Sequence, residues 1–348
     1  MLSTNHSEEI ILFQSLKDLN DAEAKQRLPT IIYLAFLVTF GVIGNSLVLF
    51  IYGFKYKPSN LRCYVLCLAV LDLTACCISM PSEIVDNAYP HMFYSEGFCK
   101  FSRFIGDVSK LGSAFVLTVM AVGRYRKICF PFSDDMSLKT AKIMCVVAIS
   151  VSVLLSWPTA FIQGQTVEHF PGNITGYGCS TDDDYRPTKY PFVQATVLLV
   201  TFAIVFCVLI FLYGKIIWEL RDHFRMNRLM KLENGLKRKK HTVTKIFLCL
   251  TLAYIVSYIP YLTLNAIRTI KRGKVMPPSP LVLGILPILF RSYFINNVVN
   301  VIVYYIGDST FRKECRRLKQ LAAAMFCSRK NIDMELRIDR SPKAVLLG

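Results

Sequence analysis

The stretch GFCKFSRFIGDVSKLGSAFVLTVMAVGRYRKICF, Gly97–Phe130, decides how many times this chain crosses a membrane. Residues 111–122 are mostly apolar and are followed by Arg124, Arg126 and Lys127, but the first half carries four charged residues, Lys100, Arg103, Asp107 and Lys110. A bilayer core of about 30 Å needs roughly 20 mostly apolar residues per helix, so this segment is the weakest candidate span. If it crosses, the two ends of the chain lie on opposite sides of the membrane.

Six further segments are long and apolar enough to cross a bilayer. The whole chain is 53% hydrophobic and only 19% charged, which is far more apolar than a soluble protein of this length. The six segments are Leu28–Phe54, Asn60–Val85, Ser137–Ile162, Tyr190–Leu220, Phe247–Ile270 and Pro280–Ile306.

The positive charges decide between six and seven spans. With seven spans and the N-terminus outside, 28 of the 41 Lys and Arg residues fall on the cytoplasmic side and 11 on the outer side. Cytoplasmic loops carry an excess of Lys and Arg, so this arrangement is favoured. The N-x-S/T sequons at Asn5 and Asn173 also fall outside. Because the net charge of +17 lies at the ends of apolar segments, nucleic acid is not an expected partner.

These patterns predict an all-α membrane protein, a seven-transmembrane helix bundle with a short C-terminal amphipathic surface helix. Residues 1–27 are expected to form an extracellular N-terminal tail, 28–306 the membrane domain, 307–327 the surface helix and 328–348 a cytoplasmic tail. Within Asp308–Phe326, apolar residues recur every three or four positions opposite a basic face, as in helices that lie on a membrane. Cys327 is either a palmitoylation site or an unmodified cysteine.

Enzyme chemistry is not expected. The sequence contains no H-E-x-x-H, no G-x-S-x-G and no phosphate-binding glycine loop. It has no C-x-x-C, and most of its twelve cysteines lie in apolar runs, where a thiol behaves as a small buried apolar group. A transporter or channel is the alternative from another class, because charged residues in membrane helices can line a path, but no internal repeat supports it.

A deep set of polar residues lies within the predicted spans. Such groups either form hydrogen bonds between helices or supply oxygen ligands to a small hard cation, and their spacing alone leaves both open. The set consists of Asn45, Asp72, Ser113, Asn296, Asn297 and Asn300.

Several motifs occur in order along the chain and at characteristic spacings. They are GVIGNSLV with Asn45, LAVLD ending in Asp72, Cys99, GRYRKICFP with Arg124, Tyr213, Pro260, NVIVY with Asn300 and Tyr304, and Phe311. From about Leu28 to Phe326 the chain resembles rhodopsin-like (class A) G protein-coupled receptors, most closely their peptide-receptor branch. The resemblance implies a plasma-membrane receptor that couples an extracellular ligand to a heterotrimeric G protein, with arrestin and membrane lipids as further partners.

The resemblance also implies roles for individual residues. It implies a disulfide between Cys99 and Cys179. It implies a sodium pocket, with Na⁺ as an allosteric ion and no other cofactor, formed by Asp72, Ser113, Asn296 and Asn300. The residues expected to serve G protein coupling are Arg124, Tyr125, Phe132, Tyr213, Thr244 and Tyr304.

The chain departs from the family's pattern at residues that control the change from the resting to the active state. Gly123 replaces the acid that normally precedes the arginine, and Lys240 stands where a second acid is often found at the foot of the sixth helix. Without these carboxylates the resting state lacks an ion pair, and we expect ligand-independent signalling. A tryptophan and two prolines that the family uses in activation are replaced here by Tyr258, Val205 and Val301. A poorly coupling or decoy receptor is therefore an alternative.

A shallower polar and aromatic set is expected to contact the ligand, although Arg291 or Lys110 could instead pair internally with Glu83 or Asp107. Amine receptors of this family carry an aspartate at the position that Gly106 occupies here. Because that aspartate is absent, an amine ligand is only the secondary prediction. The long loop 163–189 is expected to form a β-hairpin lid whose acids, Asp182–Asp184, either attract a basic peptide or form a solvated turn. A neuropeptide-like ligand is therefore predicted. The predicted ligand-binding residues are Glu83, Asp107, Lys110, Tyr258, Tyr261, Asn265, Phe290 and Arg291.

Overall fold

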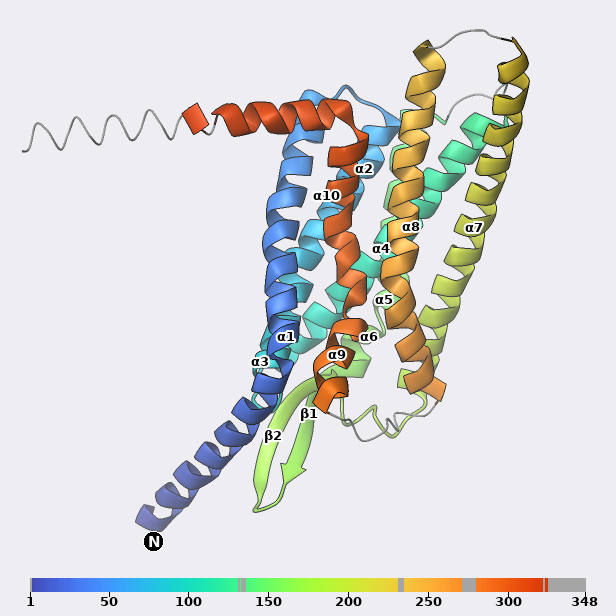
Figure 1. Ribbon diagram of the computed structural model, residues 1–348. Coiled ribbons are helices and arrows are strands. Elements are labelled where there is room, and N and C mark those ends of the chain that lie inside the picture. Colours follow the sequence, from blue (N-terminus) through green and yellow to red (C-terminus); the bar gives the residue numbers. More distant parts are fainter. Residues whose placement is uncertain are drawn as a thin grey trace, which may run out of the picture.

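The computed structural model describes residues 2–130, 132, 136–230, 235–270, 280–321, 323 and 324, and it forms a bundle of membrane-spanning helices (Figure 1). Within this part of the chain, six helices are long and apolar enough to cross a membrane, and a bent pair of helices provides a seventh span. The predicted seven-transmembrane bundle is confirmed, and Gly97–Phe130 is one of its spans.

The span boundaries follow the sequence closely at most helix ends. The second span runs through α2 (Asn60–Thr74), a π-helical turn η1 (Ala75–Ser79) and α3 (Met80–Ala88), and the fourth through α5 (Leu138–Ser156) and the short α6 (Thr159–Ile162). The seventh span is α9 (Pro280–Phe290), a 3₁₀ turn η2 (Ser292–Ile295) and α10 (Asn296–Gly307), bent by 57° at the turn. The remaining spans are α1 (Leu2–Lys55), α4 (Glu96–Cys129), α7 (Tyr190–Met230) and α8 (Gly235–Ile270).

The first helix extends through most of the predicted tail, residues 1–27. It begins at Leu2 and continues without interruption into the membrane, past Pro29. Figure 1 shows its first turns leaving the bundle beside the β-hairpin. Residues 8–27 are rich in Glu, Leu, Lys, Ala and Gln, which favour helix formation. The extension also packs on the bundle, because Leu16 and Asn20 are buried and the Asn20 amide donates to the Ala88 carbonyl.

The π-helical turn in the second span sets the direction of the side chains beyond it. A π turn contains one residue more than an α turn, so it rotates the following helix relative to the preceding one. Here it is followed closely by Pro81, which cannot donate a backbone hydrogen bond. Beyond it, Ser82, Glu83 and Asp86 are buried in the bundle rather than facing lipid.

The loop 163–189 forms the expected β-hairpin. Strands β1 (Gln163–Phe170) and β2 (Ile174–Thr181) pair antiparallel from Gln163 opposite Thr181 to Phe170 opposite Ile174. The turn needs two left-handed residues, and Gly172 and Asn173 supply them with φ of 83° and 60°. Asn173 is exposed at the tip, where a glycan can be attached. The predicted disulfide is present and ties β2 to the start of α4 through Cys99 and Cys179, with their Cα atoms 5.7 Å apart.

The chain turns sharply after α10, and residues 309–321 form a further helix that leaves the bundle sideways (Figure 1). Asp308 fixes this turn, because its carboxylate accepts hydrogen bonds from Tyr52 at 2.8 Å and Tyr56 at 2.7 Å and caps the new helix at the Thr310 amide. Phe311 is fully buried against the bundle. This helix matches the predicted surface helix, and Cys327 lies outside the described residues.

Candidate functional site

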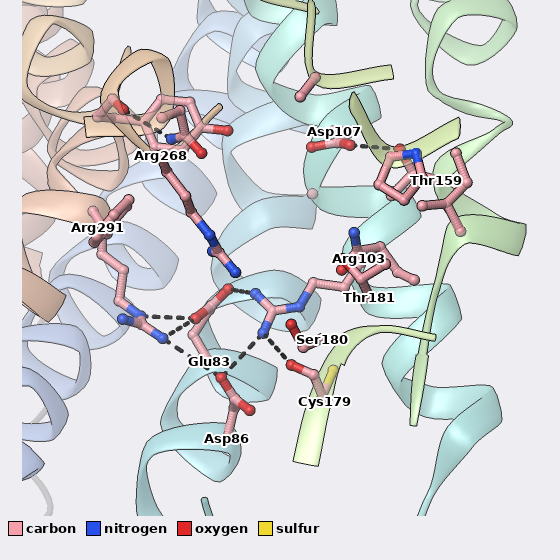
Figure 2. A pocket seen from close by; sticks show the side chains of 18 of the residues that line it. Glu83, Asp86, Arg103, Asp107, Thr159, Cys179, Ser180, Thr181, Arg268 and Arg291 are labelled. Atoms are coloured by element: carbon pink, nitrogen blue, oxygen red, sulfur yellow. Dashed lines mark hydrogen bonds and ion pairs between the residues drawn. The ribbon is translucent and has the colours of Figure 1, made fainter. Parts of the chain in front are cut away.

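A cavity of about 1600 Å³ opens on the outer side of the bundle (Figure 2). It is lined by residues of α3, α4, α7, α8 and α9 and by both strands of the hairpin, so the disulfide holds its roof. Seven of the eight predicted ligand-binding residues line it: Glu83, Asp107, Lys110, Tyr261, Asn265, Phe290 and Arg291.

Tyr258 is the eighth residue, and it does not line the cavity. Its side chain is only 1% exposed and packs below the cavity, with its ring 5.3 Å from that of Phe202 and 4.3 Å from that of Tyr254. Tyr261 and Tyr293 line the cavity above it and contact each other at 4.7 Å between ring centroids. The ring of Tyr258 therefore supports the wall rather than forming it.

Two acids and two guanidiniums form a compact cluster on one side of the cavity (Figure 2). Glu83 accepts hydrogen bonds from Arg291, at 2.7 Å from Nε, and from Arg103. Asp86 lies 3.0 Å from Arg103 and 3.5 Å from Arg291. The internal pairing of Glu83 with Arg291 is thus confirmed. Arg103 was not among the predicted site residues, although a charge inside a membrane helix is itself a functional signal.

Lys110 and Asp107 form the second predicted internal pair, with Nζ 2.6 Å from the carboxylate. Asp107 also accepts a hydrogen bond from the Thr159 hydroxyl at 2.7 Å. The Lys110 ammonium lies 4.8 Å from the ring centroid of Tyr293 and 3.3 Å from the Tyr261 hydroxyl, a cation–π and hydrogen-bonded environment. Asp107 is therefore already neutralised by a cation of its own helix.

A histidine joins two elements at the rim of the cavity. The Nε2 atom of His91 lies 2.7 Å from Glu23 of α1, and its Nδ1 atom lies 2.9 Å from Glu168 of β1. A carboxylate only accepts hydrogen bonds, so the ring donates to both only when both nitrogens carry a proton. His91 therefore connects the N-terminal helix to the hairpin. No motif marks it in the sequence, and its partner Glu23 lies in the segment predicted to be a tail.

The acidic run Asp182–Asp184 is engaged within the hairpin region and does not line the cavity. Asp182 lies 3.3 Å from Lys100, and Asp183 accepts a hydrogen bond from the Val167 amide at 2.7 Å. Asp183 also lies 3.3 Å from Arg186. Two of the three acids thus stabilise the loop, which favours the structural interpretation over attraction of a basic ligand.

The cytoplasmic end of the bundle carries the predicted coupling residues. The Arg124 guanidinium lies 4.5 Å from the ring centroid of Phe247 on α8. Tyr213 and Thr244 are buried and line a second cavity of about 90 Å³ between α7 and α8. Phe132 is fully exposed, as expected for a residue that docks on another protein.

Two further coupling residues differ in their surroundings. Tyr304 is buried, and its hydroxyl has no hydrogen-bond partner among the described residues. Tyr125 is half-buried and packs its ring against Phe130 at 5.6 Å between centroids. The hydroxyl of Tyr304 is therefore available to a new partner when the bundle rearranges.

The two switch positions that depart from the family's pattern are Gly123 and Lys240. A Cβ at Gly123 would lie 3.4 Å from the Tyr64 hydroxyl, which is an ordinary contact, so the glycine is not required by space. The side chain of Lys240 lies outside the described residues.

The deep polar set combines hydrogen bonds with a surplus of oxygen atoms. The Asn300 amide donates to Asp72 at 2.7 Å, and the Asn45 amide donates to the Asn297 carbonyl at 2.8 Å. Ser113 is buried on α4. Buried oxygens without a partner among the described residues remain on Asn45, Asp72, Asn296 and Asn300. A site with several unsatisfied oxygens fits a small hard cation, which takes oxygen ligands.

Comparison with known proteins agrees with this architecture. Residues 44–304 match the sequence profile of the family described as 7 transmembrane receptor (rhodopsin family). The chain is 26% identical to the C3a anaphylatoxin chemotactic receptor of Danio rerio over 89% of this chain and 81% of that protein. It is 24% identical to Neuropeptide FF receptor 2 of Rattus norvegicus, over 85% and 72%. It is 26% identical to a purinoceptor of Homo sapiens, over 85% and 78%.

Proposed function

This chain belongs to the rhodopsin family of seven-transmembrane receptors, and we propose that it is a plasma-membrane receptor that binds a peptide and activates a heterotrimeric G protein. The observation that carries the ligand class is the outer cavity of about 1600 Å³, which exceeds the roughly 300–1000 Å³ typical of small-molecule sites. Its polar wall and hairpin roof suit an extended chain. Neuropeptide receptors are also among the similar proteins.

The seventh span gives the ligand a route to the cytoplasmic end. Arg291 lies at the bend between α9 and η2, and its guanidinium is held by Glu83 on α3. A ligand group that binds Arg291 or Glu83 weakens the ion pair between them and so changes how firmly this bend is held. Beyond the bend, the same span carries Asn300 beside Asp72 and then Tyr304 with its hydroxyl unpaired among the described residues. Rearrangement of this segment toward Arg124 opens the surface that binds the G protein.

The deep polar set serves as a sodium site in this proposal. Asp72, Ser113, Asn296 and Asn300 would hold the ion, which would supply positive charge beside a carboxylate that is buried from solvent. The oxygens of Asp72, Asn296 and Asn300 that lack a partner within the described chain support this assignment. The ion ties the second, third and seventh spans together in the resting state.

The test is a screen of amidated and free-acid peptides on cells that express the full chain with a promiscuous Gα subunit. We expect at least one peptide to raise the second messenger, and its binding to weaken when GTPγS is added to the membranes. Arg124→Ala should abolish the response while binding persists, and Arg312→Ala on the surface helix serves as a charge-matched control. Peptide binding that ignores GTPγS, or ion currents on expression, would remove the receptor proposal.

A poorly coupling receptor is the second candidate, favoured by Gly123, Val205 and Val301 at positions used in activation. In this case arrestin rather than a G protein is the productive partner. Arrestin recruitment without second-messenger change distinguishes the two. In either case, we propose that Cys327 carries a lipid anchor.

A further inference from the structure

The charges on the cavity wall do not balance. Every carboxylate of a described lining residue has a basic side chain within 4 Å. The pairs are Glu23 with Arg27, Glu83 with Arg103 and Arg291, Asp86 with Arg103, Asp107 with Lys110, and Glu168 with His91. Within the described part of the chain, the three buried acids of the wall, Glu83, Asp86 and Asp107, are thus each paired with a Lys or Arg side chain and are not free for a basic ligand.

Two basic lining residues differ from the rest. Lys189, before α7, and Arg268, near the outer end of α8, line the cavity but form no ion pair or side-chain hydrogen bond with any described residue. Figure 2 shows the Arg268 side chain extending from the wall into the cavity, with no interaction marked to the residues drawn around it. The paired wall thus carries an excess of two positive charges directed at the ligand space.

The sequence next to Arg268 adds no acid. Residues 271–279, KRGKVMPPS, contain three basic residues and no acidic one. This segment therefore holds no carboxylate that could neutralise Arg268. A cavity lined with an excess of one sign of charge attracts ligands of the opposite charge and raises their local concentration.

From this imbalance we propose that the ligand presents an anionic group, a carboxylate or a phosphate, to Arg268, with Lys189 as a second contact. The proposal rests on the receptor function above and specifies the ligand that it recognises. Guanidinium binds carboxylate and phosphate through two parallel hydrogen bonds, which gives orientation as well as affinity. Asn265, one turn earlier on α8, lines the same wall and can contact the neighbouring part of the ligand.

An anionic ligand is thus favoured over the basic ligand that Asp182–Asp184 suggested. A cationic ligand would have to separate an existing pair, such as Lys110 with Asp107, and leave a buried cation behind. An anionic group instead pairs with a guanidinium that has no partner among the described residues. The wall therefore discriminates by charge as well as by shape.

The experiment compares three probe sets on the full-length receptor. They are peptides with a free C-terminal carboxylate, the same peptides amidated and without acidic residues, and a set of nucleoside di- and triphosphates. We expect activity in the first or the third set only, which identifies the source of the anion. Arg268→Gln should raise the EC50 of the active probe about 10- to 100-fold, as expected for loss of a charge-assisted hydrogen bond.

Two controls make the result specific. Lys25→Gln removes an exposed basic residue of α1 that does not line the cavity, and it should leave the EC50 unchanged. Arg268→Glu should weaken the anionic probe further and admit its amidated analogue. Full potency of acid-free amidated peptides, or an EC50 unaffected by Arg268→Gln, would overturn the anion site and leave the receptor proposal intact. Binding insensitive to GTPγS would count against the receptor proposal alone.

Discussion

Replacement of Glu83 by Gln is the sharpest test of the cavity wall. The Glu83 side chain is 8% exposed and lies between Arg103 and Arg291. Gln preserves its size but removes its charge, which leaves two guanidiniums to share Asp86. Breaking a buried ion pair by removing one partner costs about 3–5 kcal/mol. We expect the melting temperature of the detergent-purified receptor to fall by roughly 5–10 °C.

The matched control is Glu96→Gln, because the Glu96 side chain is 52% exposed in its pair with Lys100. Exposed pairs contribute about 0.2–1 kcal/mol, so its melting temperature should stay close to that of the wild type. The double variant Glu83→Gln/Arg291→Gln restores the balance of charges and should recover part of the loss. A thiol-reactive dye can follow unfolding, since Cys76 and Cys145 are free and buried. A Glu83→Gln melting temperature equal to that of Glu96→Gln would refute the reasoning.

Further predictions follow from individual contacts. Gly44→Ala should lower stability by about 1–3 kcal/mol, because its Cβ would lie 2.9 Å from Val301; thermal unfolding checks this. His91→Gln replaces two ring nitrogens, one facing Glu23 and one facing Glu168, by a single amide nitrogen, so one of the two contacts should be lost and amide exchange in the hairpin should speed up, as hydrogen exchange would record. Asp72→Asn should abolish any difference in melting temperature between NaCl and choline chloride, whereas a retained difference would exclude the sodium site. Lys240→Glu should lower the basal second-messenger level, and an unchanged level in unliganded cells removes the idea of a destabilised resting state.

The seven spans could be predicted because hydropathy and charge asymmetry are summed over many residues. The hairpin was expected from the family resemblance. The polar cluster was only partly predictable. Arg103 and Glu83 lie 20 residues apart on different helices, and Arg103 alone indicates only a charge that weakens a span. Only the packed bundle shows that the charge is neutralised.

Other features depend on geometry that composition does not encode. The sequence does not show that Tyr258 lies beneath Tyr261 and Tyr293 rather than on the cavity wall, because this depends on how the aromatic rings stack. The bend in the seventh span follows from a 3₁₀ turn at Ser292–Ile295, a segment that contains neither glycine nor proline. The helical N-terminal region is not predicted by hydropathy, because residues 8–27 contain many charged and polar side chains.

The continuous first helix has a consequence for the shape of the receptor outside the cell. At about 1.5 Å per residue, its 54 residues measure about 80 Å, roughly 50 Å more than the hydrocarbon thickness of a bilayer. Residues 2–27 account for about 40 Å of this length and form a stiff rod outside the membrane. Residue 5 lies about 35 Å along the helix axis from Leu28, so a sugar attached there would be held at a distance from the cavity, which this helix reaches at Glu23 and Arg27.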